Sequence, residues 1–130
     1  MQEPVWITKA VALAIHERQL SEHGGGSGVR ADGLLESALG KPQNLFAYGD
    51  GAVDLAALAA SYAFGIARNH PFVDGNKRSA LVVSRTFLRL NNADVVASKE
   101  DKYLTFLALA AGEISEDELA AWLRKNTKER

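Results

Sequence analysis

Two strongly apolar segments meet at a histidine–proline pair in the middle of the chain, and this junction restricts the possible folds most. Residues 53–69 are rich in alanine, with larger apolar side chains at helical spacing. Residues 76–90 are apolar on nearly every side, which is typical of a helix at the centre of a protein. Pro71 disfavours helical geometry at His70, so the first segment should end near that residue. The sequence therefore predicts a central helix–loop–helix.

The flanking sequence also follows the helical period. Asp32 is expected to cap a second helix, and Pro42 predicts either a kink in it or two short helices. Ser115 and Glu118 form a capping-box pattern. No convincing pair of alternating strands is present, although residues 43–53 can form a small β-flap. We predict an all-α single domain over residues 1–130, with further helices at 4–22, 33–47, from about Ser98, and from Ser115 to about Lys125.

Composition excludes several classes of function. The chain of 130 residues has no cysteine, which excludes disulfides, cysteine metal sites and thiolate catalysis. A formal net charge of −1 argues against direct nucleic-acid binding, which needs a basic surface. No apolar run approaches the ~20 residues that cross a bilayer, and the N-terminus lacks a signal-peptide pattern, so no membrane contact is expected. Five cations nevertheless cluster, which favours one small anionic ligand: Arg68, Lys77, Arg78, Arg85 and Arg89.

The junction itself, HPFVDGNKR at residues 70–78, combines the groups that bind a phosphate. Gly75 and Asn76 lie where a turn enters a helix, so consecutive backbone N–H groups can point at phosphate oxygens. Lys77 and Arg78 oppose the helix dipole, at up to about 1 kcal/mol each, unless an anion lies beside them. The alternative is ordinary turn chemistry, with Asn76 or Asp74 capping the helix. The combination of residues favours an anion site.

The same stretch also carries groups for chemistry. Asp74 is a hard oxygen ligand suited to Mg²⁺, which favours one or two carboxylates together with nucleotide phosphates. His70 can accept a proton near neutral pH and so serve as a base for an attacking hydroxyl. Phe72, following Pro71, is expected to anchor the loop in the core. Phosphoryl-type transfer requires little beyond positioning, charge neutralisation and such a base.

HPFVDGNKR resembles the signature of the Fic/Doc superfamily, whose general form is H-P-F-x-(D/E)-G-N-(G/K)-R. The segments GVRADGLLESALGKPQNLFAYG, LRLNNADV and AAGEIS are similar to such proteins as well, so the resemblance covers nearly the whole chain. AMP-transferring Fic enzymes typically have glycine at the position of Lys77 and a second arginine at that of Leu81. The chain therefore resembles the Doc (death-on-curing) branch, and an all-α Fic/Doc-like bundle with a central active site and a small flap is implied.

That resemblance implies a toxin of a toxin–antitoxin module, cytoplasmic and encoded by a bacterium or phage. It would use ATP and Mg²⁺ to transfer the terminal phosphoryl group to a hydroxyl of an elongation factor Tu-like protein, arresting translation and growth. The flap would align the target segment by strand addition. The cognate antitoxin would fold its disordered tail onto the toxin.

By the same resemblance, His70 is the base and Asp74 holds Mg²⁺. The phosphate ligands are Asn76, Lys77 and Arg78, with backbone donors at Gly75; Arg68 is either a further phosphate ligand or a helix-end cation. Two other functions stay open: AMP transfer to a protein hydroxyl, and a non-catalytic module that only binds an antitoxin.

Three further features have simpler interpretations. His16 and His23 lack acidic partners at ligand spacing and are interpreted as surface or helix-end residues. HGGGSG, residues 23–28, is interpreted as a flexible connector, because no lysine of a phosphate loop follows it. The apolar side chains of the first and last helices either form an antitoxin groove or belong to the core: Trp6, Ile7, Leu119, Trp122 and Leu123.

Overall fold

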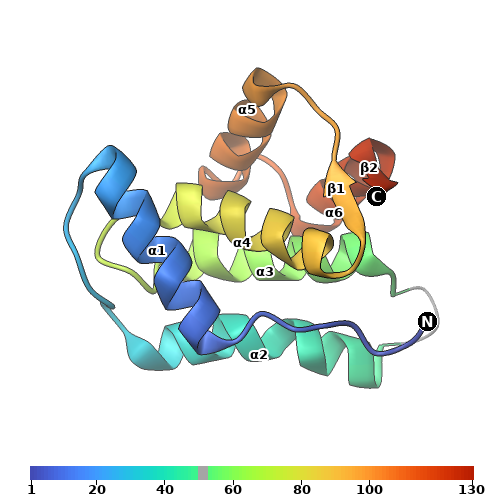
Figure 1. Cartoon of the computed structure of the whole chain (residues 1–130), viewed down its shortest axis with the longest axis horizontal. Coiled ribbons are helices and arrows are strands. Elements are labelled where there is room, and N and C mark those ends of the chain that lie inside the picture. Colours follow the sequence, from blue (N-terminus) through green and yellow to red (C-terminus); the bar gives the residue numbers. More distant parts are fainter. Residues whose placement is uncertain (50–52) are drawn as a thin grey trace.

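The computed structural model describes residues 1–49 and 53–130 and confirms the all-α prediction (Figure 1). The helices are α1 (Lys9–His23), α2 (Asp32–Tyr48), α3 (Leu55–Asn69), α4 (Asn76–Leu90), α5 (Lys99–Ala110) and α6 (Glu116–Asn126). Two short strands, β1 (Ala93–Val95) and β2 (Thr127–Glu129), complete the described elements. Within the described ranges, no helix combines the length and apolar character needed to cross a membrane.

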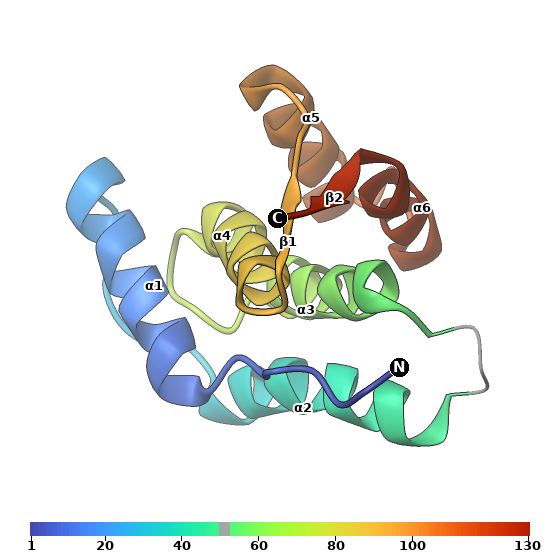
Figure 2. The same ribbon diagram turned by 45° about the vertical axis from the view of Figure 1, so that its right-hand side comes forward.

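The α3–α4 pair occupies the centre of the molecule. In Figures 1 and 2, α1 and α2 lie on one side of this pair, and α5 and α6 lie on the other. Small residues allow α2 to approach α3 closely: a Cβ on Gly65 of α3 would lie 3.0 Å from the Cβ of Ala38 in α2. The predicted helix–loop–helix is confirmed, and α4 has the predicted bounds. The loop between α3 and α4 therefore joins two helices that pack at the centre of the molecule.

The first helix starts later than predicted. It begins at Lys9, because Thr8 caps it by accepting a hydrogen bond from the N–H of Val11. Residues 1–8 are not helical, so the prediction that the helix begins at Pro4 is wrong. Ile7 is buried, and its N–H donates to the Tyr62 hydroxyl at 3.0 Å. A tertiary contact with α3 thus replaces the first expected turn of helix.

The second helix runs through its proline. Pro42 is buried inside α2, and the helix continues to Tyr48 without dividing into two. Asp32 does not cap this helix as predicted: Ala31 is at the N-cap position, and the Asp32 carboxylate pairs with Lys9 at 2.7 Å. The ion pair joins the starts of α1 and α2.

The β-flap prediction is wrong for residues 43–48, which are helical, and residues 50–52 lie outside the described part of the chain. Helical spacing places Phe46 against Trp6, with ring centroids 5.7 Å apart, edge to face. That packing favours a helix over a strand at residues 43–48.

Ile7, Leu119 and Leu123 are buried in the core, so they do not form the antitoxin groove considered above.

β1 and β2 pair antiparallel, with Ala93 opposite Glu129 and Val95 opposite Thr127. The expectation of no strand pair is therefore wrong. The sequence could not reveal β2, because Thr127–Glu129 is short and has no apolar alternation. A left-handed turn follows α4 at Asn92, whose φ is 65°.

Candidate active site

Six of the predicted site residues line one cleft of about 480 Å³ at the loop between α3 and α4. Apolar residues at the end of α5 and directly after it form the facing wall: Leu107, Ala110 and Ala111. The loop and the start of α4 supply the polar groups: His70, Asp74, Gly75, Asn76, Lys77 and Arg78. The cleft therefore has an apolar wall opposite a mixed set of one acid, one imidazole and two cations.

His70 directly follows α3 and has a left-handed backbone, with φ 50° and ψ 56°. This conformation costs roughly 1–2 kcal/mol for a residue with a Cβ, and such strain persists only where the surroundings fix it. The residue is exposed and lines the cleft. Its imidazole is thus presented to the cleft by an unusual backbone turn.

The loop is anchored below His70. Pro71 is buried and Phe72 is fully buried, as expected of an anchor. The Asn76 side chain accepts a hydrogen bond from the Phe72 N–H and donates one to the Phe72 carbonyl, both at 3.1 Å. That amide therefore holds the loop closed and does not cap α4. Asn76 could therefore contact a phosphate through its backbone N–H and not through its side chain.

Asp74 lies at the rim of the cleft, and one carboxylate oxygen accepts a hydrogen bond from the Gly75 N–H at 2.8 Å. Gly75 has a φ of 77° and is the N-cap residue of α4. Among the described residues, no three acidic, histidine or cysteine side chains are grouped so that they could hold a metal ion. A lone carboxylate fits Mg²⁺, which keeps several waters and binds nucleotide phosphates, and does not fit a metal caged by protein ligands.

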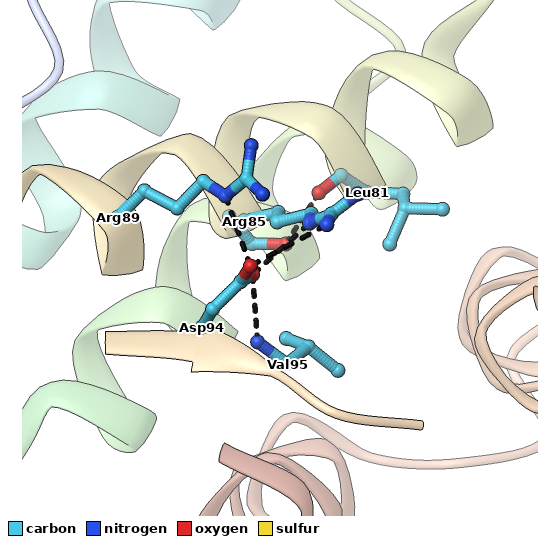
Figure 3. Close-up of polar contacts among 6 residues, drawn as sticks. Leu81, Arg85, Arg89, Asp94 and Val95 are labelled. Carbon is cyan, nitrogen blue, oxygen red and sulfur yellow. Dashed lines mark hydrogen bonds and ion pairs between the residues drawn. The ribbon is translucent and has the colours of Figure 1, made fainter. Parts of the chain in front are cut away.

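Lys77 and Arg78 are exposed in the first turn of α4, and within residues 1–49 and 53–130 no ion pair engages them. Arg85 and Arg89, by contrast, each bind Asp94 through Nε at 3.0 Å (Figure 3). Burial raises the Asp94 pKa, but these hydrogen bonds outweigh it and lower the pKa to about 2. Of the clustered cations, Arg85 and Arg89 are thus paired with an acid, whereas Lys77 and Arg78 at the cleft are not paired within the described part of the chain.

Arg68 lies outside the residues that line the cleft. Its guanidinium carbon is 5.6 Å from the centre of the Phe64 ring. One guanidinium nitrogen is 3.4 Å from where a Cβ on Gly112 would lie, at the turn after α5. The side chain therefore reaches towards the base of the α5 wall.

His16 is the site residue that the sequence interpretation missed. It is only 2% exposed, so its assignment as a surface residue is wrong. Its ring stacks on Phe72 with centroids 3.8 Å apart, and its Nε2 donates to the Asp74 carbonyl at 2.8 Å. The available signal was helical spacing, since His16 follows buried Ala12 by one turn and precedes buried Gln19. His23 is exposed near the end of α1, as expected.

The fold and the cleft define a protein of the Fic/Doc class, and the comparisons agree. Residues 6–88 match the family model described as Fic/DOC family, and the chain belongs to that family. "Protein kinase doc" of Escherichia phage P1 is 38% identical over 113 residues, covering 87% of this chain and 88% of that protein. "Toxin Doc" of Mycolicibacterium smegmatis is 40% identical over 74 residues, or 57% of each chain. Both relatives support the Doc branch.

Proposed function

We propose that this protein is a Doc-type toxin that transfers the terminal phosphoryl group of ATP to a hydroxyl of a bacterial translation elongation factor. The supporting observation is the cleft, where one base, one carboxylate and two unpaired cations meet at the start of α4. Relatives named as a protein kinase and as a toxin support both parts of the proposal. The cellular consequence would be arrest of translation in the cytoplasm.

In this proposal, each polar residue of the cleft has one task. His70 takes the proton from the attacking hydroxyl. Lys77, Arg78 and the first backbone N–H groups of α4 bind the phosphates and neutralise their charge. Asp74 would hold Mg²⁺, which with ATP would supply the phosphoryl group and further charge neutralisation. The apolar α5 wall excludes water from the opposite side.

AMP transfer is the second candidate, and the structure offers an argument against it. Leu81, one turn after Arg78, is apolar and half-buried. Arg85 is bound to Asp94 on β1 and does not replace the missing cation. Beyond its first turn, α4 thus offers a phosphate no cation that is free of an ion pair. This favours transfer of the terminal group held at that turn.

An antitoxin is the second proposed partner. A groove of about 430 Å³ between α1, α4 and α5 has Arg78 and the apolar Leu81 and Val82 among its lining residues. Because Arg78 also lines the active cleft, an antitoxin segment in this groove would restrict access to a phosphate ligand.

The test is intact-mass spectrometry of bacterial elongation factor Tu after incubation with the protein, Mg²⁺ and ATP. We expect a gain of one phosphoryl group that is absent with His70→Ala. A gain of one AMP would instead establish the second candidate, and no gain on any translation factor would refute the proposed substrate class. The Lys77→Gly, Leu81→Arg double variant should weaken phosphoryl transfer. Unchanged transfer would show that these positions do not select the reaction.

A further inference from the structure

The connection between α1 and α2 lies along the active loop. We call residues 24–31 the glycine segment. The Val73 N–H donates to the Gly28 carbonyl at 3.1 Å, and the N–H groups of Arg30 and Ala31 donate to the Pro71 carbonyl at 2.7 and 3.1 Å. Val29 and Phe72 form an antiparallel bridge. Residues 23–28 were interpreted above as a flexible connector, but Gly28 and the residues after it are paired with the main chain of the loop (Figure 1).

Arg30 extends this pairing with its side chain. Its Nε donates to the His70 carbonyl at 2.7 Å, and its terminal nitrogen donates to the Asn69 carbonyl at 2.9 Å. Carbonyls at a helix C-terminus have no partner inside the helix, and a cation there is favoured by the dipole. The planar guanidinium satisfies both oxygens at once.

The position of the His70 carbonyl is coupled to the position of its imidazole. The ψ angle of His70 sets the direction of its carbonyl, so a donor fixed on this oxygen restrains the left-handed backbone. That backbone in turn sets the direction in which the side chain leaves the chain. Arg30 does not line the cleft, so it does not bind the phosphates proposed there.

We infer that Arg30 is a positioning residue for His70: its guanidinium holds the main chain of the base in the left-handed conformation that presents the imidazole to the cleft. The inference rests on the proposed function, in which His70 is the base. It adds a residue from outside the motif, contributed by a segment that reaches the loop from a different pair of helices.

The matched variants are Arg30→Met and Arg18→Met. Both remove a guanidinium and keep an unbranched stem, but Arg18 is 78% exposed and, among the described residues, pairs with Glu22 of its own helix alone. Arg30→Lys keeps the charge without the planar fork. It serves as a second variant should Arg30→Met fold poorly, and urea unfolding of all three checks folding.

Two measurements are made on each variant. The first is the ¹³C chemical shifts of His70 Cα and Cβ, which report its backbone angles. The second is steady-state phosphoryl transfer to the elongation factor, with ATP affinity measured separately by calorimetry. For Arg30→Met we expect shifted His70 resonances, a loss of turnover of about tenfold to a hundredfold, and ATP affinity within about twofold of the wild type. Arg30→Lys should be intermediate, and Arg18→Met should match the wild type.

The outcomes distinguish the positioning role of Arg30 from the proposed phosphoryl transfer. Unchanged His70 shifts in Arg30→Met would overturn the inference whatever the activity. Shifted resonances with full turnover would overturn the positioning role, because the conformation would not matter to the reaction. If the wild type transferred no phosphoryl group while the shifts moved as expected, the proposed function would fail and the grip of Arg30 on the His70 backbone would stand.

Discussion

Replacing Asp94 with asparagine tests the charge distribution around α4. Asp94 accepts hydrogen bonds from Arg85, Arg89 and the Val95 N–H, as Figure 3 shows. Its pKa falls from an ordinary 3.8 to about 2, in spite of burial. At about 1.4 kcal/mol per pKa unit, this corresponds to roughly 2.5 kcal/mol. Because both arginines are more than a third exposed, solvent screening reduces the expected contribution to about 1–2 kcal/mol.

The sign of the effect follows from the direction of the shift. A carboxylate with a lowered pKa stabilises the folded state above its ordinary pKa, and this stability is lost as pH falls through the folded value. Urea unfolding should therefore show Asp94→Asn less stable than the wild type by about 1–2 kcal/mol at neutral pH. The difference should shrink as pH falls from about 4 towards 2. Exposed Glu17→Gln is the control. Equal stability at neutral pH, or a difference independent of pH, would refute the reasoning.

Three further predictions concern the loop. Phe72→Ala should lower the free energy of unfolding by about 3–5 kcal/mol in urea, and a loss below about 1 kcal/mol would contradict its complete burial. His16→Leu should cost about 1–3 kcal/mol and weaken ATP binding, because the Asp74 carbonyl loses its donor; an unchanged variant would argue against that hydrogen bond. Gly25→Ala places a Cβ 2.7 Å from an Asp74 carboxylate oxygen, so calorimetry should show weaker Mg²⁺-dependent ATP binding than for Gly28→Ala, whose Cβ meets nothing within 4 Å. Equal effects would point to backbone strain, since both glycines have positive φ.

Local signals in the sequence were sufficient for most helices. The bounds of α4 follow from the turn at Gly75 and from the asparagines after Leu90. The capping box at Ser115 and Glu118 is present with both hydrogen bonds. These features depend on residues within one turn of each other, which a sequence displays directly.

Features that depend on distant contacts could not be predicted. The course of the chain before α1 is held by a hydrogen bond from Ile7 to Tyr62, on another helix. Residues 43–48 are helical although a flap was expected there, because Phe46 packs against Trp6. The burial of His16 had a partial signal in helix spacing, but its partner on the loop had none.

In the candidate site, too, the features set by the motif were predicted and those set by distant contacts were not. The motif placed His70, Asp74, Lys77 and Arg78 at one cleft, and the structure brings them together there. Their proposed chemical roles stay predictions. The sequence did not predict two sets of hydrogen bonds. The Asn76 side chain binds the backbone of Phe72, and Arg30 donates twice to carbonyls at the end of α3. Such bonds depend on side-chain directions that the spacing of residues in a motif does not specify.

The hydrogen bonds around the loop also bear on how the protein folds. The bond from Arg30 to His70 joins residues 40 apart, and that from His16 to Asp74 joins residues 58 apart. Closing long stretches of chain costs entropy that only the assembled core offsets, so such contacts form late. A peptide of α3, loop and α4 would contain every motif residue without these restraints. Because the cleft also needs Leu107 and Ala110 from α5, a chain still emerging from the ribosome has no complete site until nearly all of it has been made.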